Sequence, residues 1–357
     1  MPSLANTAAP RCVMLGARRV GPGLSTYVIA EAGVNHDGDV SQALRLVDAA
    51  AEAGADAVKF QAFRAAELTP AAAPAAAYQR ATGAVDQQTM LAQLELTDDG
   101  FAAIAAHCRA AGIDFLATPF GPRDVARLVA LDVPALKLAS TDLDNLPLVR
   151  CAAATGRALL VSTGAATAEE IAGAVARLRS LDAADRLVLL HCVSCYPTPL
   201  AAANLRAVAT LAAEFGVPAG LSDHTTSTQT GGWAVAAGAC VLEKHFTLSR
   251  GAAGPDHAMS LTPDELRAYI AAVRDVETAL GDGVLGMSAL EHDVRRVARK
   301  SLVAARDLPA GAALTTADLC AKRPAGGITP AQIDMVVGRR LRQPVAADTP
   351  LTWDVLV

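Results

Sequence analysis

The sequence predicts an α/β protein in which a (β/α)8 TIM barrel precedes a small β-rich domain. Eight short apolar runs alternate with helix-like segments over residues 1–280 of the 357-residue chain. Uninterrupted apolar runs separated by helices indicate parallel strands that are buried on both faces. Eight such units in roughly 250 residues match one closed barrel. From residue 298 onward, short strand-like runs and Gly/Pro turns replace the helices, which indicates a second domain of a different class.

The predicted elements follow one another in a regular order. An open doubly wound sheet is the alternative, but the turn after the first run lacks the glycine spacing of a dinucleotide-binding motif. Ser41, Asp98 and Thr262 are expected to cap the helices that follow them. Segment 64–96 is long for a βα connection and is expected to cover the barrel mouth. Strands are expected at 27–33, 57–63, 114–120, 135–140, 158–164, 187–193, 218–224 and 240–246, helices at 41–53, 98–111, 168–181, 205–215 and 263–280, a linker at 281–297 and the second domain at 298–357.

Composition excludes several classes of protein. Hydrophobic residues make up 52% and charged residues 19% of the chain, which excludes a disordered protein. The net charge of −5, without a Lys/Arg stripe, argues against nucleic acid or anionic membranes as partners. No apolar run approaches the ~20 residues of a membrane span. The seven cysteines are dispersed, and Cys192 and Cys195 lack a second pair for a zinc site. We therefore expect a cytoplasmic protein with reduced thiols.

Polar residues gather at the carboxyl end of every predicted strand. In a barrel these ends meet at one mouth, where the chemistry is found. Charged groups inside apolar strands are costly unless they have a partner or a ligand. Separate turn-forming roles would explain such residues on one strand, but not on eight. The set comprises Glu31, Lys59, Gln61, Thr118, Lys137, Ser140, Ser162, His191, Ser194, Tyr196, Ser222, Asp223, His224, Glu243, Lys244 and His245.

Two histidines of this set stand on neighbouring strands. His224 and His245 are expected within a few ångströms of each other, with Asp256 on the following loop. Two imidazoles beside open positions suit a divalent transition metal, and two hydrogen-bonded core histidines are the alternative.

Two lysines of the set lie inside strands. Lys59 and Lys137, together with serine hydroxyls, suit a phosphate or carboxylate ligand. Internal pairs with Glu31 or Glu243 are the alternative. The residues alone thus predict a barrel enzyme that binds a phosphorylated anion beside a metal, which fits aldol-type condensation, isomerisation or metal-assisted hydrolysis.

Several motifs, in order, resemble the sialic acid synthase family. Lys322, Arg323 and Pro324, followed by Gly327 and Ile328, resemble the C-terminal antifreeze-like (SAF) domain of that family. The likeness covers roughly residues 25–355. The barrel motifs are IAEAGVNH at 29–36, VKFQ at 58–61, STG at 162–164, HCVSCYPTP at 191–199, GLSDHT at 220–225, LEKHFT at 242–247 and GPDH at 254–257.

The resemblance implies a nonulosonic (sialic) acid synthase. Such an enzyme condenses phosphoenolpyruvate with an N-acetylmannosamine-type sugar to a nine-carbon 2-keto-3-deoxy acid, an N-acetylneuraminate or legionaminate-like product, and releases phosphate. His224 and His245 would hold a divalent metal, Mn²⁺ or alternatively Mg²⁺ or Co²⁺. Glu31, Glu243, Lys59 and Asp256 would be catalytic. The substrate-binding set would be Lys59, Gln61, Thr118, Lys137, Ser140, Ser162, Ser194, Tyr196, Ser222 and Arg323.

The resemblance also implies a domain-swapped homodimer in which Arg323 reaches the sugar bound by the other subunit. Ser194 stands where bacterial neuraminate synthases have Asn. The sugar is therefore left open among N-acetylmannosamine, its 6-phosphate and a 2,4-diacetamido-6-deoxy relative.

The reaction itself needs a base. Carbon 3 of the enol attacks the aldehyde, and water adds at carbon 2 before phosphate leaves; either Glu31 or Glu243 can take the proton of that water. Two alternatives remain at this point. One is a phosphoenolpyruvate-dependent condensation with another aldose or a sugar 6-phosphate, and the other is a catalytically inactive relative that binds phosphoenolpyruvate.

Overall fold

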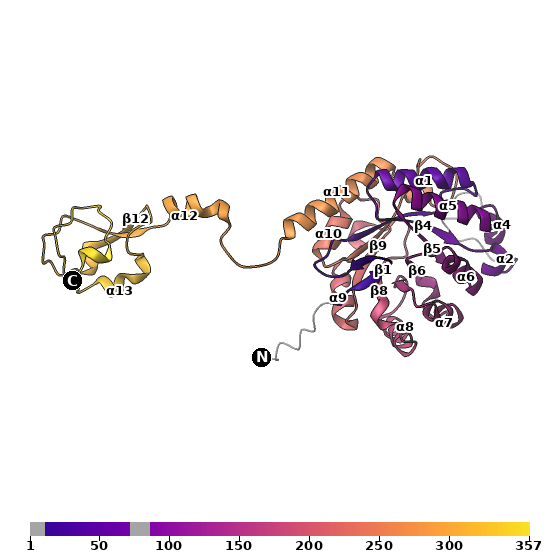
Figure 1. The fold of residues 1–357 in the computed structure, drawn as a ribbon, viewed down its shortest axis with the longest axis horizontal. Helices are drawn as coiled ribbons and strands as arrows, with labels where there is room; N and C mark the ends of the chain where they lie inside the picture. Colours follow the sequence, from indigo (N-terminus) through magenta and orange to yellow (C-terminus); the bar gives the residue numbers. More distant parts are fainter. Residues whose placement is uncertain (1–10, 72–85) are drawn as a thin grey trace. The chain divides into compact units, whose positions relative to one another are not determined.

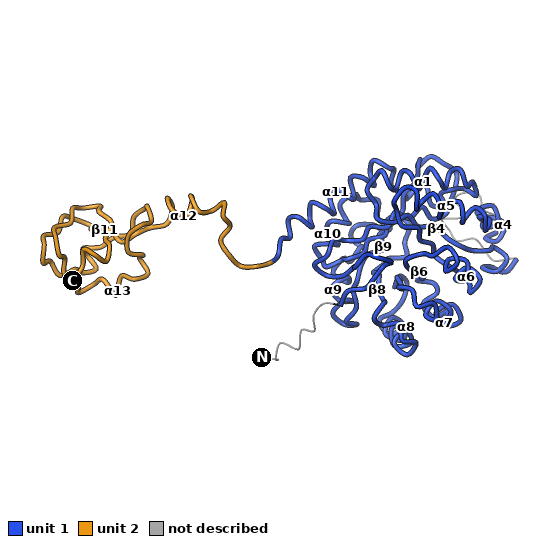
Figure 2. The backbone as a smooth tube through the Cα atoms, viewed as in Figure 1, with its two compact units in different colours: residues 1–282 blue, residues 283–357 orange. Residues whose placement is uncertain are grey.

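The computed structural model describes residues 11–71 and 86–357. The chain divides into two compact units, residues 1–282 and 283–357 (Figure 2). The first unit contains a parallel sheet surrounded by helices, and the second contains a small antiparallel sheet (Figure 1).

Eight parallel strands form the sheet of the first unit. Their order is β5-β4-β3-β10-β9-β8-β7-β6, and β5 and β6 at its two ends lie side by side, so the sheet is nearly closed. The predicted barrel is confirmed. The strands are β3 (Tyr27–Gly33), β4 (Ala57–Ala62), β5 (Asp114–Pro119), β6 (Ala135–Leu138), β7 (Ala158–Ser162), β8 (Leu187–Cys192), β9 (Ala219–Asp223) and β10 (Val241–His245).

Helices cover the outer face of the barrel. Thr262 caps α11 as predicted, but α1 is capped by Asp39 instead of Ser41, and α5 by Thr97 instead of Asp98. The reason is local: Asp39 and Thr97 are extended, and their side chains accept from N–H groups of the first turn. The helices are α1 (Val40–Glu52), α2 (Ala65–Leu68), α4 (Gln87–Ala92), α5 (Asp98–Ala111), α6 (Pro122–Ala130), α7 (Leu146–Ala154), α8 (Ala168–Ser180), α9 (Arg206–Phe215), α10 (Thr230–Ala236) and α11 (Pro263–Leu280).

Side chains of each barrel strand alternate between two cores. In β7, Leu159 and Val161 belong to the core between the sheet and the helices, whereas Ala158 and Leu160 belong to the core inside the barrel. Because the side-chain period of a strand is two, Ser162 is the next residue that faces inward. The same counting identifies the inward residue at the carboxyl end of each of the seven remaining barrel strands.

A hairpin closes the amino-terminal end of the barrel. Strands β1 (Val13–Leu15) and β2 (Arg18–Val20) pair antiparallel. Val13, Leu15 and Val20 join the inner core, together with the first inward residues of the barrel strands. The hairpin therefore plugs one end of the barrel and leaves the carboxyl end as the mouth.

We expect Leu15→Ala to lower the free energy of unfolding by about 2–5 kcal/mol, because it leaves a cavity in a closed core. Leu15 is 1% exposed, whereas its neighbour Met14 is 50% exposed. Met14→Ala is the matched control and should change stability by less than about 0.5 kcal/mol. Urea unfolding measures both, and equal effects would contradict the plug.

The second unit has its own core. Strand β11 (Ser301–Ala304) pairs antiparallel with β12 (Leu319–Lys322), and α13 (Ile333–Val336) follows. Helix α12 (His292–Ala298) covers the last residues of the expected linker and the first residue of the expected second domain. The small β-rich domain is confirmed. Its core comprises Leu302, Ala304, Leu308, Leu314, Leu319, Ile328, Val336, Leu341, Val345, Leu351 and Leu356.

Within the described parts of the chain, the helices lack the combined length and apolarity that crossing a lipid bilayer requires.

Candidate active site

Four buried charges meet inside the barrel mouth. They are Glu31 on β3, Lys59 on β4, Lys137 on β6 and Glu243 on β10, and we call them the charged cluster. The Nζ atom of Lys59 lies 2.7 Å from Oε2 of Glu31 and 3.6 Å from Oε2 of Glu243. The Nζ atom of Lys137 lies 4.0 Å from the same Glu243 oxygen. The internal Lys–Glu pairs considered from the sequence are therefore present, and the four formal charges balance.

The two carboxyl groups of the cluster differ in acidity. Burial raises the pKa of Glu31 to about 7, although the neighbouring Lys59 opposes this shift. Burial would also raise the pKa of Glu243, but Lys137, Lys59 and the hydroxyl of Ser222 together lower it. That hydroxyl donates to Oε1 of Glu243 at 2.8 Å. Glu31 can therefore exchange a proton near neutral pH, while Glu243 stays ionised.

Hydroxyl groups lie at the carboxyl ends of strands that carry or neighbour the two lysines. Lys59 donates to Oγ1 of Thr118 at 2.9 Å, and Lys137 donates to the carbonyl of Leu138 at 3.0 Å. The hydroxyl of Ser140 accepts from the backbone N–H of Gly164 at 2.9 Å. The buried hydroxyl of Ser162 has no hydrogen-bond partner among the described residues. An unpartnered buried hydroxyl at the end of β7, the neighbour of the strand that carries Lys137, leaves hydrogen-bonding capacity for an anionic ligand.

The two histidines lie next to each other, as predicted. The ring centroids of His224 and His245 are 5.5 Å apart. Nδ1 of His224 lies 2.8 Å from the carbonyl oxygen of Val193. A carbonyl can only accept, so Nδ1 carries the proton and Nε2 keeps its lone pair. Burial lowers the pKa of His245, which keeps its imidazole neutral.

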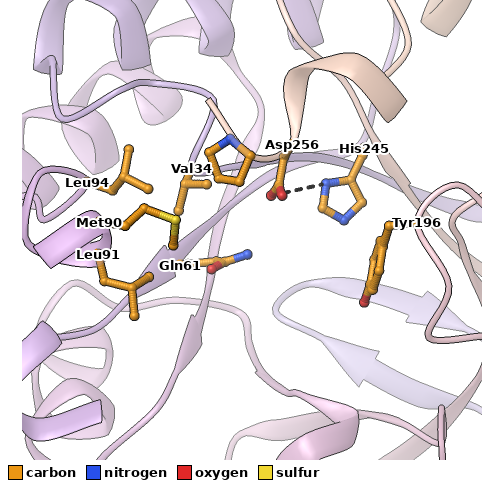
Figure 3. A pocket seen from close by; sticks show the side chains of 9 residues that line it. Val34, Gln61, Met90, Leu91, Leu94, Tyr196, His245 and Asp256 are labelled. Atoms are coloured by element: carbon orange, nitrogen blue, oxygen red, sulfur yellow. Dashed lines mark ion pairs between the residues drawn. The ribbon is translucent and has the colours of Figure 1, made fainter. Parts of the chain in front are cut away.

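This arrangement suits a divalent cation. Nδ1 of His245 is buried, makes no hydrogen bond within the described part of the chain, and lies 3.9 Å from Oδ2 of Asp256 (Figure 3). Over residues 11–71 and 86–357, His, Cys, Asp and Glu side chains form no group of three that could hold a metal. His224 and His245 would thus supply two nitrogen ligands and leave other positions to substrate or water.

A pocket beside the histidines has one polar and one apolar side. Gln61, Tyr196, His245 and Asp256 line the polar side (Figure 3). Three residues of the segment 64–96 that is expected over the mouth, Met90, Leu91 and Leu94, contribute to the opposite side. Residues 72–85 of that segment lie outside the described residues. We call this side the apolar wall, and it comprises Val34, Met90, Leu91 and Leu94.

Glycine is required where the pocket meets the charged cluster. Gly33 has a φ of +55°, a conformation that side-chain-bearing residues rarely adopt. A Cβ atom at this position would lie 3.3 Å from carboxylate oxygens of both Glu31 and Asp256. A larger residue would therefore crowd the two acids.

Three polar residues expected at the mouth lie on the outer face instead. Nε2 of His191 lies 2.9 Å from the carbonyl oxygen of Ala203. Asp223 and Lys244 form an ion pair with each other at 2.9 Å. The expectation was wrong because strand alternation turns every second polar residue away from the mouth.

Three further predicted residues, Ser194, Tyr196 and Arg323, lie outside the strands. Ser194 is exposed on the loop after β8, and its hydroxyl oxygen would be 2.4 Å from a Cβ atom at Gly164, so it lies against the STG segment. Tyr196 stacks near His224, with ring centroids 4.2 Å apart. Arg323 is exposed on the second unit.

Sequence reasoning missed Cys192 as an inward residue. Its Sγ atom lies 3.8 Å from Nδ1 of His224 and 3.8 Å from the hydroxyl of Ser140. Burial alone would lower the pKa of His224, but the contact with Cys192 raises it. Alternation with Val188 and Leu190 was the available signal. The apolar wall had no signal, because its members come from separate segments.

Comparisons with known proteins agree with these features. Residues 46–285 match the model of the NeuB family, and residues 299–357 match the SAF domain. The chain is 39% identical over 344 residues to the N,N'-diacetyllegionaminic acid synthase of Legionella pneumophila, covering 95% of this chain and 97% of that one. The enzyme of the same name from Campylobacter jejuni is 39% identical over 317 residues, covering 88% and 95%.

A solved structure is also similar. The N-acetylneuraminic acid (sialic acid) synthetase of Leptospira borgpetersenii superposes with a TM-score of 0.73 and 33% identity, covering 81% of this chain and 96% of that one. The resemblance drawn from the sequence motifs is confirmed.

Proposed function

The chain belongs to the NeuB family and carries a SAF domain, and from this premise we propose that it is a nonulosonic acid synthase. It condenses phosphoenolpyruvate with an N-acylated amino-mannose to a nine-carbon 2-keto-3-deoxy acid and phosphate. Two relatives with 39% identity are synthases of N,N'-diacetyllegionaminic acid. The observation that carries the proposal is the charged cluster beside the imidazole pair at one mouth.

The cluster supports binding of phosphoenolpyruvate. Lys59 and Lys137 present two ammonium groups, which neutralise the carboxylate and phosphate through charge-assisted hydrogen bonds. The unpartnered hydroxyl of Ser162 and the nearby Ser140 add donors. The ligand replaces the internal Lys–Glu pairs and thereby frees Glu31 for proton transfer.

The residues account for each proton of the reaction. Carbon 3 of the enol bonds to the aldehyde carbon, and the aldehyde oxygen takes a proton from water through Asp256, which lines the pocket and is ionised above its pKa, which burial raises to about 6. Water adds to the cationic carbon 2 and loses a proton to Glu31. The bond between carbon 2 and the phosphate oxygen then breaks with its electron pair on the phosphate, which takes the proton of the carbon 2 hydroxyl, and carbon 2 becomes the keto carbon. A divalent cation held by His224 and His245 would supply Lewis acidity for the aldehyde oxygen.

The apolar wall favours an unphosphorylated 6-deoxy sugar. None of the nine described residues that line the pocket is Lys or Arg, so a 6-phosphate would lack a cationic partner there. A methyl group or an acetamido methyl packs against Met90, Leu91 and Leu94 without that cost. We therefore place a 2,4-diacetamido-6-deoxy sugar ahead of N-acetylmannosamine and its 6-phosphate.

Sugar-dependent phosphate release tests the proposed function. The protein is incubated with Mn²⁺, phosphoenolpyruvate and one sugar at a time, and products are identified by mass spectrometry. We expect release with the 2,4-diacetamido-6-deoxy sugar, and more slowly with N-acetylmannosamine. Release only with erythrose or arabinose phosphate would support the condensation of a simple sugar phosphate. Tight phosphoenolpyruvate binding without release from any amino-mannose would support an inactive relative.

We further infer that the active form is a homodimer in which Arg323 binds the acyl group of the sugar held by the other subunit. Arg323→Ala should then raise the sugar KM about 10- to 100-fold, as expected for loss of a charged hydrogen bond, and leave the KM for phosphoenolpyruvate within about twofold. Lys322→Ala is the matched control, because Lys322 pairs with Asp348 inside its own unit.

Subunit mixing tests the homodimer. Partial recovery of activity when Arg323→Ala and His245→Ala proteins exchange subunits would support capping between subunits. An unchanged sugar KM in Arg323→Ala would contradict it.

A further inference from the structure

An enclosed ion pair lies on the outer face of the two strands that carry the histidines. The side chains of Asp223 on β9 and Lys244 on β10 are each 1% exposed. Nζ of Lys244 lies 2.9 Å from Oδ2 of Asp223, and the two residues are direct partners in the strand register. The pair points away from the mouth, so the proposed reaction does not use it directly.

Every donor of the buried ammonium group has an acceptor. Besides Asp223, Lys244 donates to the carbonyl oxygen of Thr225 at 2.5 Å and to its hydroxyl at 3.2 Å. The ammonium also lies 5.2 Å from the ring centroid of Tyr269 on α11. Tyr269 reaches this place because Gly231 has no side chain, since a Cβ atom there would lie 2.5 Å from the tyrosine ring.

The carboxylate of the pair is equally well bound. Asp223 accepts from the backbone N–H of Thr225 at 2.9 Å through Oδ1, and from the hydroxyl of Thr230 through Oδ2. Asp223 and Lys244 therefore both hold Thr225. We call Asp223, Thr225 and Lys244 the outer clamp.

Two residues of the outer clamp are the sequence neighbours of His224. Strand β9 ends at Asp223, and Asp223–Lys244 is the last pair of its register with β10. His224 lies one residue beyond that ladder, between the two clamp residues Asp223 and Thr225. On the partner strand, Lys244 stands between Glu243 and His245. Contacts on the outer face therefore join the two backbone segments from which the imidazoles enter the mouth.

We propose that the Asp223–Lys244 pair is a positioning device that holds His224 opposite His245 from outside the barrel. A buried ion pair is often no more stabilising than apolar residues of the same size, so stability alone does not account for it. Strand register and the placement of Thr225 account for the pair, because it joins two strands at the point where their backbone ladder stops. The metal-binding consequence rests on the proposed function, whereas the backbone consequence does not.

The test separates positioning from stability. Lys244→Met and Asp223→Asn each leave one buried charge unpaired, and the double variant removes both charges while nearly preserving volume. For each protein, Tm is measured, Mn²⁺ affinity is measured by electron paramagnetic resonance without substrates, and hydrogen exchange is measured over residues 219–225 and 241–245. Asp56→Asn is the matched control, because Asp56 joins Arg18 and Arg274 near the other end of the barrel.

We expect both single variants to lose Tm and Mn²⁺ affinity. The double variant should recover most of the Tm but keep a Mn²⁺ Kd about 10- to 100-fold above wild type, as for loss of groups that orient metal ligands. Its hydrogen exchange should be faster over 222–225. Asp56→Asn should lower Tm and leave the Mn²⁺ Kd within about twofold. A double variant with wild-type Mn²⁺ affinity and wild-type exchange would overturn the proposal.

A third variant covers failure of the double variant to fold. Thr225→Val removes one acceptor of Lys244 and leaves no charge without its counter-charge, so it should lower Tm less than either single charge variant and raise the Mn²⁺ Kd about 2- to 10-fold; an unchanged Kd would overturn the proposal. If wild-type protein binds no Mn²⁺, the metal part of the proposed function fails. Hydrogen exchange then decides on the pair: faster exchange over 222–225 in the double or Thr225→Val variant supports it, and unchanged exchange overturns it.

Discussion

His245→Ala should abolish metal-dependent turnover while the barrel stays folded. His245 supplies one of the two imidazoles at the mouth, and its buried Nδ1 makes no hydrogen bond within the described residues. Because the ring lines an open pocket, removing it should destabilise the fold less than the cavity left by Leu15→Ala, by about 2 kcal/mol or less. The rate of phosphate release should fall more than ~100-fold, because loss of groups that merely orient metal ligands already costs about 10- to 100-fold.

The control is a histidine of a different kind. His107 pairs with Asp48 on the outside of the barrel, so His107→Ala should keep full activity. Mn²⁺ titration followed by electron paramagnetic resonance should show binding to wild type and His107→Ala, and loss of binding in His245→Ala. Unchanged turnover in His245→Ala would remove the metal assignment and leave two core histidines.

Glu31→Gln should lower kcat by about 10²- to 10⁴-fold, the usual contribution of a positioned base. Because burial raises the pKa of Glu31 to about 7, its basic form is scarce at pH 6 and predominates at pH 8. The wild-type kcat/KM for phosphoenolpyruvate should therefore rise with pH, with a midpoint near 7, and level off above it. Glu31→Gln should lack this rise.

The second carboxylate serves as the matched control. Glu243 contributes to the raised pKa of Glu31 through its negative charge. Glu243→Gln should keep the rise of kcat/KM with pH and move its midpoint below 7, because the amide has no negative charge to raise the pKa of Glu31. If kcat/KM of Glu31→Gln still rises with pH at the same midpoint, Glu31 is not the base. Titration of the substrate itself would give that result.

Much of the site follows from strand periodicity. Glu31, Lys59, Lys137 and Glu243 were expected at one mouth because parallel strands end together, and the structure brings all four within ion-pair distance. Two imidazoles on adjacent strands were likewise expected to be close. These predictions needed only the order of the strands and the positions of the polar residues.

Strand alternation explains two errors in the prediction from sequence. Counting every polar residue at a strand end as inward placed His191, Asp223 and Lys244 in the mouth, whereas alternation from Leu190 and Leu221 turns them outward. The same counting would have identified Cys192 as an inward residue.

Other features depend on contacts between distant segments. The pocket joins Val34, Gln61 and Leu94 to Tyr196 and Asp256, which no local pattern relates. The acidity of Glu31 and Glu243 differs because burial and the two lysines act on them unequally, and this depends on distances of a few ångströms.

The order of apolar runs and their period of two was thus sufficient for the barrel, its mouth and the residue types gathered there, because strand geometry is local and repeats. Folding in three dimensions was needed to show which carboxyl group keeps its proton, which residues form the apolar wall, and that an outer ion pair underlies the histidines. Burial and electrostatic interaction depend on the whole surroundings of a side chain, and those surroundings come from parts of the chain that are remote in sequence.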